Sequence, residues 1–134
     1  MRIERRKPLT ANIGIFGVGH RTYWEQFPGL KQELLGYMDE FERLVRTLSA
    51  DSGTNGVNTV NFGMADDAES AYALRKRIQA ADLDLLFCDM LTYAPACTWA
   101  TILRETNVPM VLVALQPLKA LDYTKANTYT QLAN

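Results

Sequence analysis

The sequence is poor in the residues that build metal sites and disulfide frameworks. It has a single histidine, His20, and two cysteines, Cys88 and Cys97, which are not spaced as a C-x-x-C pair. Two thiols do not make a disulfide framework, and no long apolar stretch follows the basic cluster at residues 2–7 as it would in a signal peptide. We therefore expect reduced cysteines in a cytoplasmic protein. One histidine cannot build a multi-histidine site, so we expect no metal to be bound by this chain alone.

Strong charge imbalance and long apolar runs are missing as well. The formal net charge is −1, which argues against a nucleic-acid partner, because such proteins usually carry a basic patch. No apolar run approaches the roughly 18 residues of a membrane span, so we expect no membrane partner. The glycines of residues 14–19 are not spaced as G-x-G-x-x-G, and no phosphate-binding P-loop motif occurs, so a dinucleotide or nucleotide site is unsupported.

The 134 residues, 48% of them apolar, are enough for one domain with a real core. Short apolar runs with β-favouring residues predict strands over residues 12–17, 57–62, 83–88 and 109–114. An apolar stripe from Leu30 to Leu48 predicts a helix of about five turns that begins near Pro28. Two more helices are expected, one over residues 68–81 with Asp66 or Asp67 as its cap, and one over residues 96–106.

Alternating strands and helices are typical of a parallel sheet with helices on both faces. We therefore predict an α/β fold with an open parallel sheet of about four strands, flavodoxin-like or Rossmann-like. The near-continuous apolar strands are expected to be covered on both sides. Residues 115–134 show no strong apolar periodicity, and we interpret residues 1–134 as the N-terminal α/β domain of a larger protein.

Ligands of open parallel sheets bind beyond the carboxyl ends of the strands, so the residues that follow each strand are the candidates for a site. His20, Tyr23 and Trp24 follow the first strand, and Gln116 follows the fourth. Aromatic faces with a few imidazole, amide and hydroxyl groups suit a sugar. The alternatives are purely structural roles, in which His20 is a hydrogen-bonded loop residue and the side chains of Tyr23, Trp24 and Phe27 form a hydrophobic plug against the first helix. Trp99 is expected in the core, and Asp66 as a helix cap rather than an acid or base.

Three segments resemble the arabinose/fucose isomerase superfamily. I-G-I-F-G-V-G-H-R-T-Y, Ile13 to Tyr23, resembles the first strand and loop of L-arabinose isomerases. L-L-F-C-D-M-L-T-Y-A-P-A-C-T-W, Leu85 to Trp99, resembles the third strand of that family with its turn and its Trp-bearing helix. V-P-M-V-L-V-A-L-Q, Val108 to Gln116, resembles a fourth strand that ends on glutamine. The three segments occur in the family's order and span most of the chain.

The resemblance implies a three-domain, oligomeric, cytoplasmic enzyme that interconverts an aldose and a ketose with Mn²⁺ or a similar divalent metal. The metal ligands lie in later domains, so this chain alone is expected to be inactive. The N-terminal domain packs beside a neighbouring subunit's active site, where His20, Tyr23, Gln116 and Asn134 would face the sugar. Gly19 stands where arabinose isomerases have glutamine, and Asn134 near a position usually held by histidine, so the identity of the sugar stays open.

Two alternatives to the isomerase remain. The first is a non-enzymatic sugar-binding or receiver-like α/β module. Asp89 after the third strand matches the pattern of a receiver, but the acidic pair that a receiver carries after its first strand is missing. A flavodoxin-type cofactor domain is the second, and its phosphate loop should be rich in Ser and Thr where this loop is aromatic.

Overall fold

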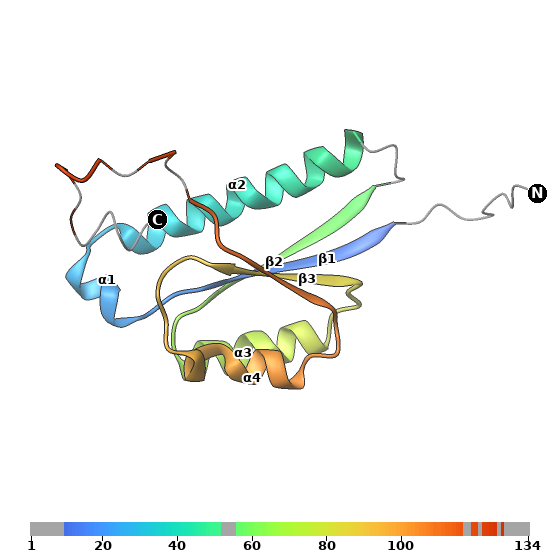
Figure 1. Cartoon of the computed structure of the whole chain (residues 1–134). Helices are drawn as coiled ribbons and strands as arrows, with labels where there is room; N and C mark the ends of the chain where they lie inside the picture. The colour runs from blue at the N-terminus through green and yellow to red at the C-terminus, as the bar shows by residue number, and fades with distance from the viewer. Residues whose placement is uncertain (1–9, 52–55, 117–118, 121, 126, 128–134) are drawn as a thin grey trace, which may run out of the picture.

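The computed structural model describes residues 10–51, 56–116, 119–120, 122–125 and 127, except the side chains of residues 49–51. Strands and helices alternate along the chain, apart from a short additional helix before the first long one (Figure 1). The elements are β1 (Ala11–Val18), α1 (Thr22–Gln26), α2 (Leu30–Asp51), β2 (Val57–Ala65), α3 (Ala68–Gln79), β3 (Leu85–Met90), α4 (Ala96–Glu105) and β4 (Met110–Val113). No helix in this described part of the chain is both long and apolar enough to cross a membrane.

The four strands form one parallel sheet in the order β2-β1-β3-β4. This is the strand order of the flavodoxin-like fold and not that of the Rossmann fold, in which the order begins 3-2-1-4. The register between β1 and β2 shifts between Ile15 and Gly17, where the β2 segment carries an extra residue. Gly63 lies in this bulge with φ of +89°, a conformation that side-chain-bearing residues rarely adopt.

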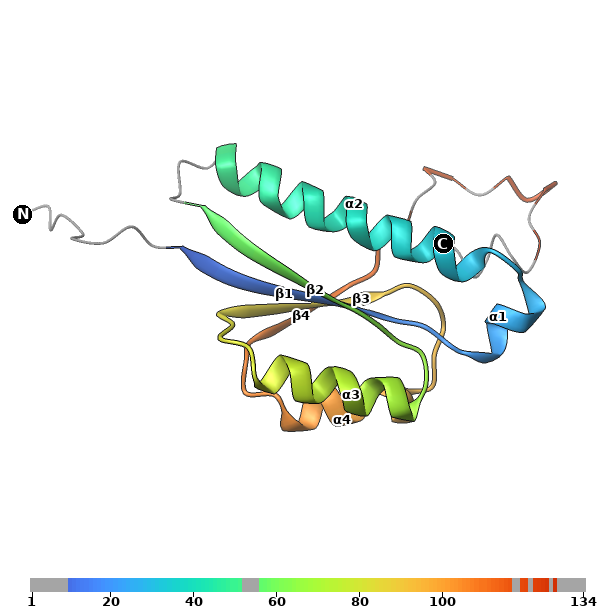
Figure 2. The ribbon, with the colours of Figure 1, turned by 180° about the vertical axis from the view of Figure 1, so that it is seen from behind.

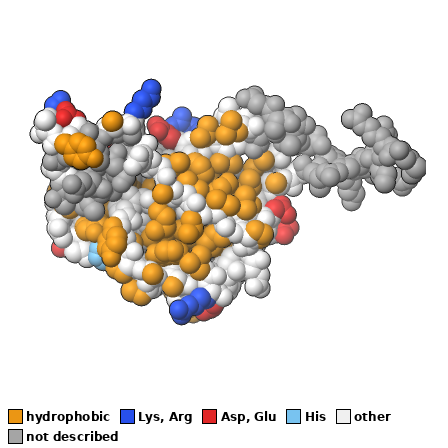
Figure 3. Space-filling view, viewed as in Figure 1, with side chains coloured by type: hydrophobic (Ala, Val, Ile, Leu, Met, Phe, Trp, Pro, Cys, Tyr) orange, Lys and Arg blue, Asp and Glu red, His pale blue; other side chains and the backbone are white. Residues whose placement is uncertain are grey.

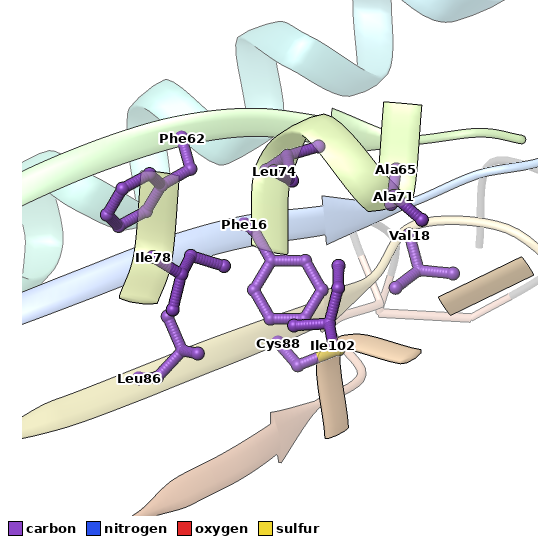
Figure 4. Close-up of a cluster of buried hydrophobic side chains, with 10 residues drawn as sticks. All are labelled: Phe16, Val18, Phe62, Ala65, Ala71, Leu74, Ile78, Leu86, Cys88 and Ile102. Carbon is purple, nitrogen blue, oxygen red and sulfur yellow. The ribbon is translucent and has the colours of Figure 1, made fainter. Parts of the chain in front are cut away.

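Helices lie on both faces of the sheet, with α2 on one face and α3 and α4 on the other (Figures 1 and 2). Each face has its own buried core. The α3 and α4 face packs around Phe16, Leu74 and Ile102 (Figure 4), and the α2 face packs around Ile15, Leu34 and Met38, with the rest of each core drawn from neighbouring strands and helices. The predicted α/β fold with an open four-stranded parallel sheet is therefore confirmed.

Several local boundaries differ from the prediction. The expected loop after β1 contains the short helix α1. Strand β2 runs three residues further than predicted, to Ala65, and β3 begins and ends two residues later, so that it includes Asp89. The backbone of Asp89 pairs with Gly17 of β1 and Val113 of β4, because tertiary strand pairing, and not the apolar run alone, sets where a strand ends.

The expectation that every strand is covered on both sides is wrong for β4. Helix α2 packs over β1 and β2 and reaches β3 through the contact of Phe41 with Phe87, whereas β4 on the same sheet face has no helix above it in the described part of the chain. Val111 shares this face with Phe87, its register partner, and is 42% exposed. Figure 3 shows a broad hydrophobic area here, below α2. We call it the open face, and its exposed members are Leu44, Leu48, Val111 and Leu115.

We expect the chain to self-associate through the open face, because contiguous exposed apolar area of this kind favours association. The double variant Leu44→Lys/Leu48→Lys should weaken self-association, since it places two charges within the open face at little cost to the helix. Leu103→Lys is the matched control, because Leu103 is also a partly exposed leucine but lies on α4, on the opposite face. Sedimentation velocity over a range of protein concentrations measures the effect. A wild-type chain that stays monomeric throughout, or an equal effect of Leu103→Lys, would contradict this prediction.

Candidate functional site at the carboxyl edge of the sheet

The carboxyl edge of the sheet has a point at which the chain leaves neighbouring strands toward opposite faces. After β1 the chain runs to α2 on one face, and after β3 it runs to α4 on the other. Such a switch point is where open α/β sheets bind ligands. The two strands stay joined at this edge, because the backbone N–H groups of Leu91 and Thr92 both donate to the carbonyl oxygen of Val18, at 3.1 and 3.3 Å.

His20 and Tyr23, both predicted to contact a sugar, lie against each other at this edge. Their ring centroids are 5.1 Å apart with the rings nearly perpendicular, and the backbone N–H of Tyr23 donates to the carbonyl oxygen of His20 at 3.0 Å. Both side chains are half-buried. Tyr23, Trp24 and Phe27 pack against the core under α2, so they do form the hydrophobic plug that the sequence left as an alternative. His20 and Tyr23 nevertheless both remain partly exposed at this sheet edge.

Gly19 is buried and is tightly surrounded. A Cβ at this position would lie 2.6 Å from Met64 Sδ and 2.9 Å from the Trp24 ring. Any side chain here would force those two residues to shift. Glycine at position 19 therefore fits the close packing of this loop.

Asp66 has a different role from the one predicted, because the helix cap of α3 is Asp67. The Asp67 carboxylate accepts a hydrogen bond from the backbone N–H of Ser70 at 2.7 Å and forms an ion pair with Arg21. Asp66, 7% exposed, accepts hydrogen bonds from Trp24 Nε1 at 2.7 Å and from Lys31 Nζ at 2.6 Å. This carboxylate ties α1 and α2 to the end of β2, so it braces the loop that carries His20.

The pKa values of the two carboxyls agree with these structural roles. Burial raises the pKa of Asp66, but the hydrogen bonds from Lys31, Trp24 and Ser70 outweigh burial and leave that pKa below its usual value. The backbone and side chain of Ser70, with Arg21, lower the pKa of Asp67 to about 2. Both carboxylates are therefore ionised and partnered at neutral pH, which favours a structural role over acid–base chemistry.

A cavity of about 460 Å³ opens between α2 and the ends of β3 and β4. Gln116, a predicted sugar contact, lies at this cavity together with Asp89 of β3. The remaining wall is mainly apolar, and the described lining residues are Leu34, Tyr37, Glu40, Phe41, Leu44, Asp89, Met90, Leu91, Leu115 and Gln116. A mostly apolar cavity with a few polar groups is the usual form of a small-molecule site.

Asp89 is the unusual group of this cavity. It is 2% exposed, and no described residue donates a hydrogen bond to its carboxylate. Burial raises its pKa to about 6. Burial, with the nearby charge of Asp89, also raises the pKa of the Cys88 thiol to about 12, so Cys88 is an inert core residue and not a nucleophile.

The structure places the four predicted sugar contacts in three groups. His20 and Tyr23 are in contact, Gln116 lies at the cavity, and Asn134 lies outside the described residues. Among the described residues that line the cavity, neither His20 nor Tyr23 occurs, so the structure shows two neighbouring polar groups at one sheet edge and not a single pocket. Trp99 packs against the core of the α3 and α4 face, as predicted.

Sequence reasoning missed the contribution of α2 to the cavity. Tyr37 follows Leu34 by three residues and Phe41 follows Tyr37 by four, which places all three on one helical side. The sequence does not show that this side reaches β3. Asp89 was noted only as following the third strand. Its position within β3, with the side chain on the α2 side of the sheet, follows from pairing with Val113, which no local pattern reveals.

Within the described ranges, no three His, Cys, Asp or Glu side chains gather so that they could hold a metal ion. The resemblance places the metal ligands in later domains, so no catalytic step through a metal is derived for this chain. Comparison of the sequence with models of known protein families and with curated proteins finds no match.

Proposed function

We propose that this chain is the N-terminal α/β domain of an aldose–ketose isomerase of the L-arabinose/L-fucose type, and that it contributes sugar contacts beside a neighbouring subunit's active site. The observation that carries the proposal is the contact between His20 and Tyr23 at the carboxyl edge of a parallel sheet with a switch point, the same edge at which Gln116 lines a separate cavity. The resemblance of three ordered segments supports the isomerase parent. In that parent, Mn²⁺ or a similar metal held by other domains would polarise the sugar carbonyl.

The proposed role of the three side chains is to hold sugar hydroxyls. A neutral imidazole offers one donor and one acceptor, a phenol one donor with acceptor capacity, and an amide two donors and an acceptor. These groups suit a neutral polyol, and the Asp66 network holds the loop that presents two of them. A sugar-binding module without an enzymatic parent would use the same contacts. The receiver-like alternative has less support, because the acidic pair that a receiver needs after its first strand is missing.

We expect L-arabinose or L-fucose to bind this chain, and His20→Ala and Gln116→Ala each to weaken that binding about two- to tenfold. A lost hydrogen bond of this kind is worth about 0.5–1.5 kcal/mol. Gln32→Ala is the matched control, because Gln32 is an exposed glutamine on α2 that does not line the cavity. Two-dimensional NMR titration of each variant gives the affinity, and a melting curve on the same sample reports stability. A lowered melting temperature with unchanged sugar affinity would remove both residues from the site.

A further inference from the structure

The cavity between α2 and the β3–β4 ends has a chemistry that a sugar does not explain. Its only charged lining side chains among the described residues are Glu40 and Asp89, both acidic. Glu40 is exposed and has a cationic neighbour, since Arg43 lies 3.6 Å from its carboxylate. Asp89 has no such partner within the described part of the chain. The uncompensated charge of the cavity is therefore the carboxylate of Asp89.

Asp89 is held with its side chain on the α2 side of the sheet, where the cavity opens. Its backbone is fixed on both sides by pairing with β1 and β4, and it lies on the sheet face that α2 covers in part. Only 2% of the residue is exposed, yet it lines the cavity. A buried carboxylate without a donor is costly, and the cost falls when a charged donor forms a hydrogen bond with it.

Lys31 and Lys125 do not supply that donor, because each already forms an ion pair with another carboxylate. Lys31 pairs with Asp66 at 2.6 Å, and Lys125 pairs with Asp122 at 3.4 Å. The cavity wall instead offers apolar and aromatic surface next to the carboxylate, including Leu34, Phe41 and Leu91. Aromatic rings also attract cations through their faces.

We propose that this cavity binds a small organic amine, with the ammonium group on the Asp89 carboxylate and the apolar body of the ligand against Leu34, Phe41 and Leu91. Tyr37 and Gln116 lie at the same cavity and supply further polar contacts. An ammonium is favoured over a hydroxyl, because a charge-assisted hydrogen bond to a buried carboxylate is about twice as strong as a neutral one. The site shares Gln116 with the proposed sugar contacts, but the His20–Tyr23 pair is not among its described lining residues.

The test uses two probes of nearly equal shape, cyclohexylamine and cyclohexanol, which differ in carrying an ammonium or a hydroxyl. Two-dimensional NMR titration at neutral pH should show saturable shifts around α2 and the end of β3, with the amine binding at least about tenfold more tightly than the alcohol. Asp89→Asn should remove that preference by weakening amine binding about tenfold while leaving the alcohol unchanged. Asp82→Asn, at an exposed position near the other end of the sheet, is the matched control and should leave both affinities unchanged.

Three results would overturn the proposal. These are equal affinity for the two probes in the wild-type chain, amine binding that survives Asp89→Asn, and the absence of saturable shifts with either probe. A denaturation curve on the Asp89→Asn protein confirms that it is folded. His20→Ala separates this proposal from the sugar site, because it should weaken sugar binding and leave amine binding unchanged.

Discussion

Asp89→Asn is expected to raise the free energy of unfolding by about 1–3 kcal/mol at about pH 8. The folded chain buries the carboxylate of Asp89 without a hydrogen-bond donor from the described residues, and burial raises its pKa from the ordinary 3.8 to about 6. Holding that group ionised in the folded state therefore costs free energy. Asparagine keeps the shape of the side chain and removes the charge.

The effect has a defined pH dependence. Because the pKa of Asp89 is higher in the folded chain than in the unfolded chain, the folded chain binds more protons between about pH 4 and pH 6, so the wild type loses stability as pH rises through that range. Above about pH 6 the full destabilisation by the ionised Asp89 is present. At acid pH, where both states are protonated, the wild type and Asp89→Asn should be nearly equal in stability.

Urea denaturation at about pH 8 and about pH 3.5 measures both differences. Asp82→Asn is the control, because it removes a carboxylate that is already exposed, so it should change stability by only a few tenths of a kcal/mol. A destabilised Asp89→Asn variant at the higher pH would mean that the carboxylate has a stabilising partner. It would also weaken the case for an amine ligand.

Phe16→Ala is expected to lower the free energy of unfolding by about 3–5 kcal/mol, which is a large share of the stability of a domain this size. Phe16 is fully buried on β1, and its ring lies between α3 and α4, beside Ile102 (Figure 4). Truncation removes apolar area and leaves a cavity that the rigid sheet cannot close.

Two further variants show whether the loss comes from packing. Phe16→Leu keeps most of the side-chain volume and should cost clearly less than Phe16→Ala. Val60→Thr changes an exposed β-branched residue on β2 and should be close to neutral. Urea denaturation gives all three values. A loss below about 1 kcal/mol for Phe16→Ala would show that the core on this face is looser than the structure indicates.

The candidate site was only partly predictable. The positions of His20, Tyr23 and Gln116 at one edge followed from placing them after parallel strands, since the carboxyl ends of such strands share an edge. The contacts that residues at this edge make with other parts of the chain could not be predicted from the sequence. Trp24 seemed available for a sugar, but its indole N–H donates to Asp66, a residue 42 positions away, and pairings at such separation leave no local pattern in the sequence.

Local sequence by itself determined the kind and order of the main elements. The apolar stripe that runs from Leu30 predicted α2, and the short β-favouring runs predicted four strands, because these periods follow from helix and strand geometry alone. Only the tertiary structure decided the order β2-β1-β3-β4, the uncovered face beside β4 and the inclusion of Asp89 in β3. These features depend on which strands pair and which helix crosses which face. The contacts that set them join residues far apart in the chain, and their energies appear only when the whole sheet is assembled.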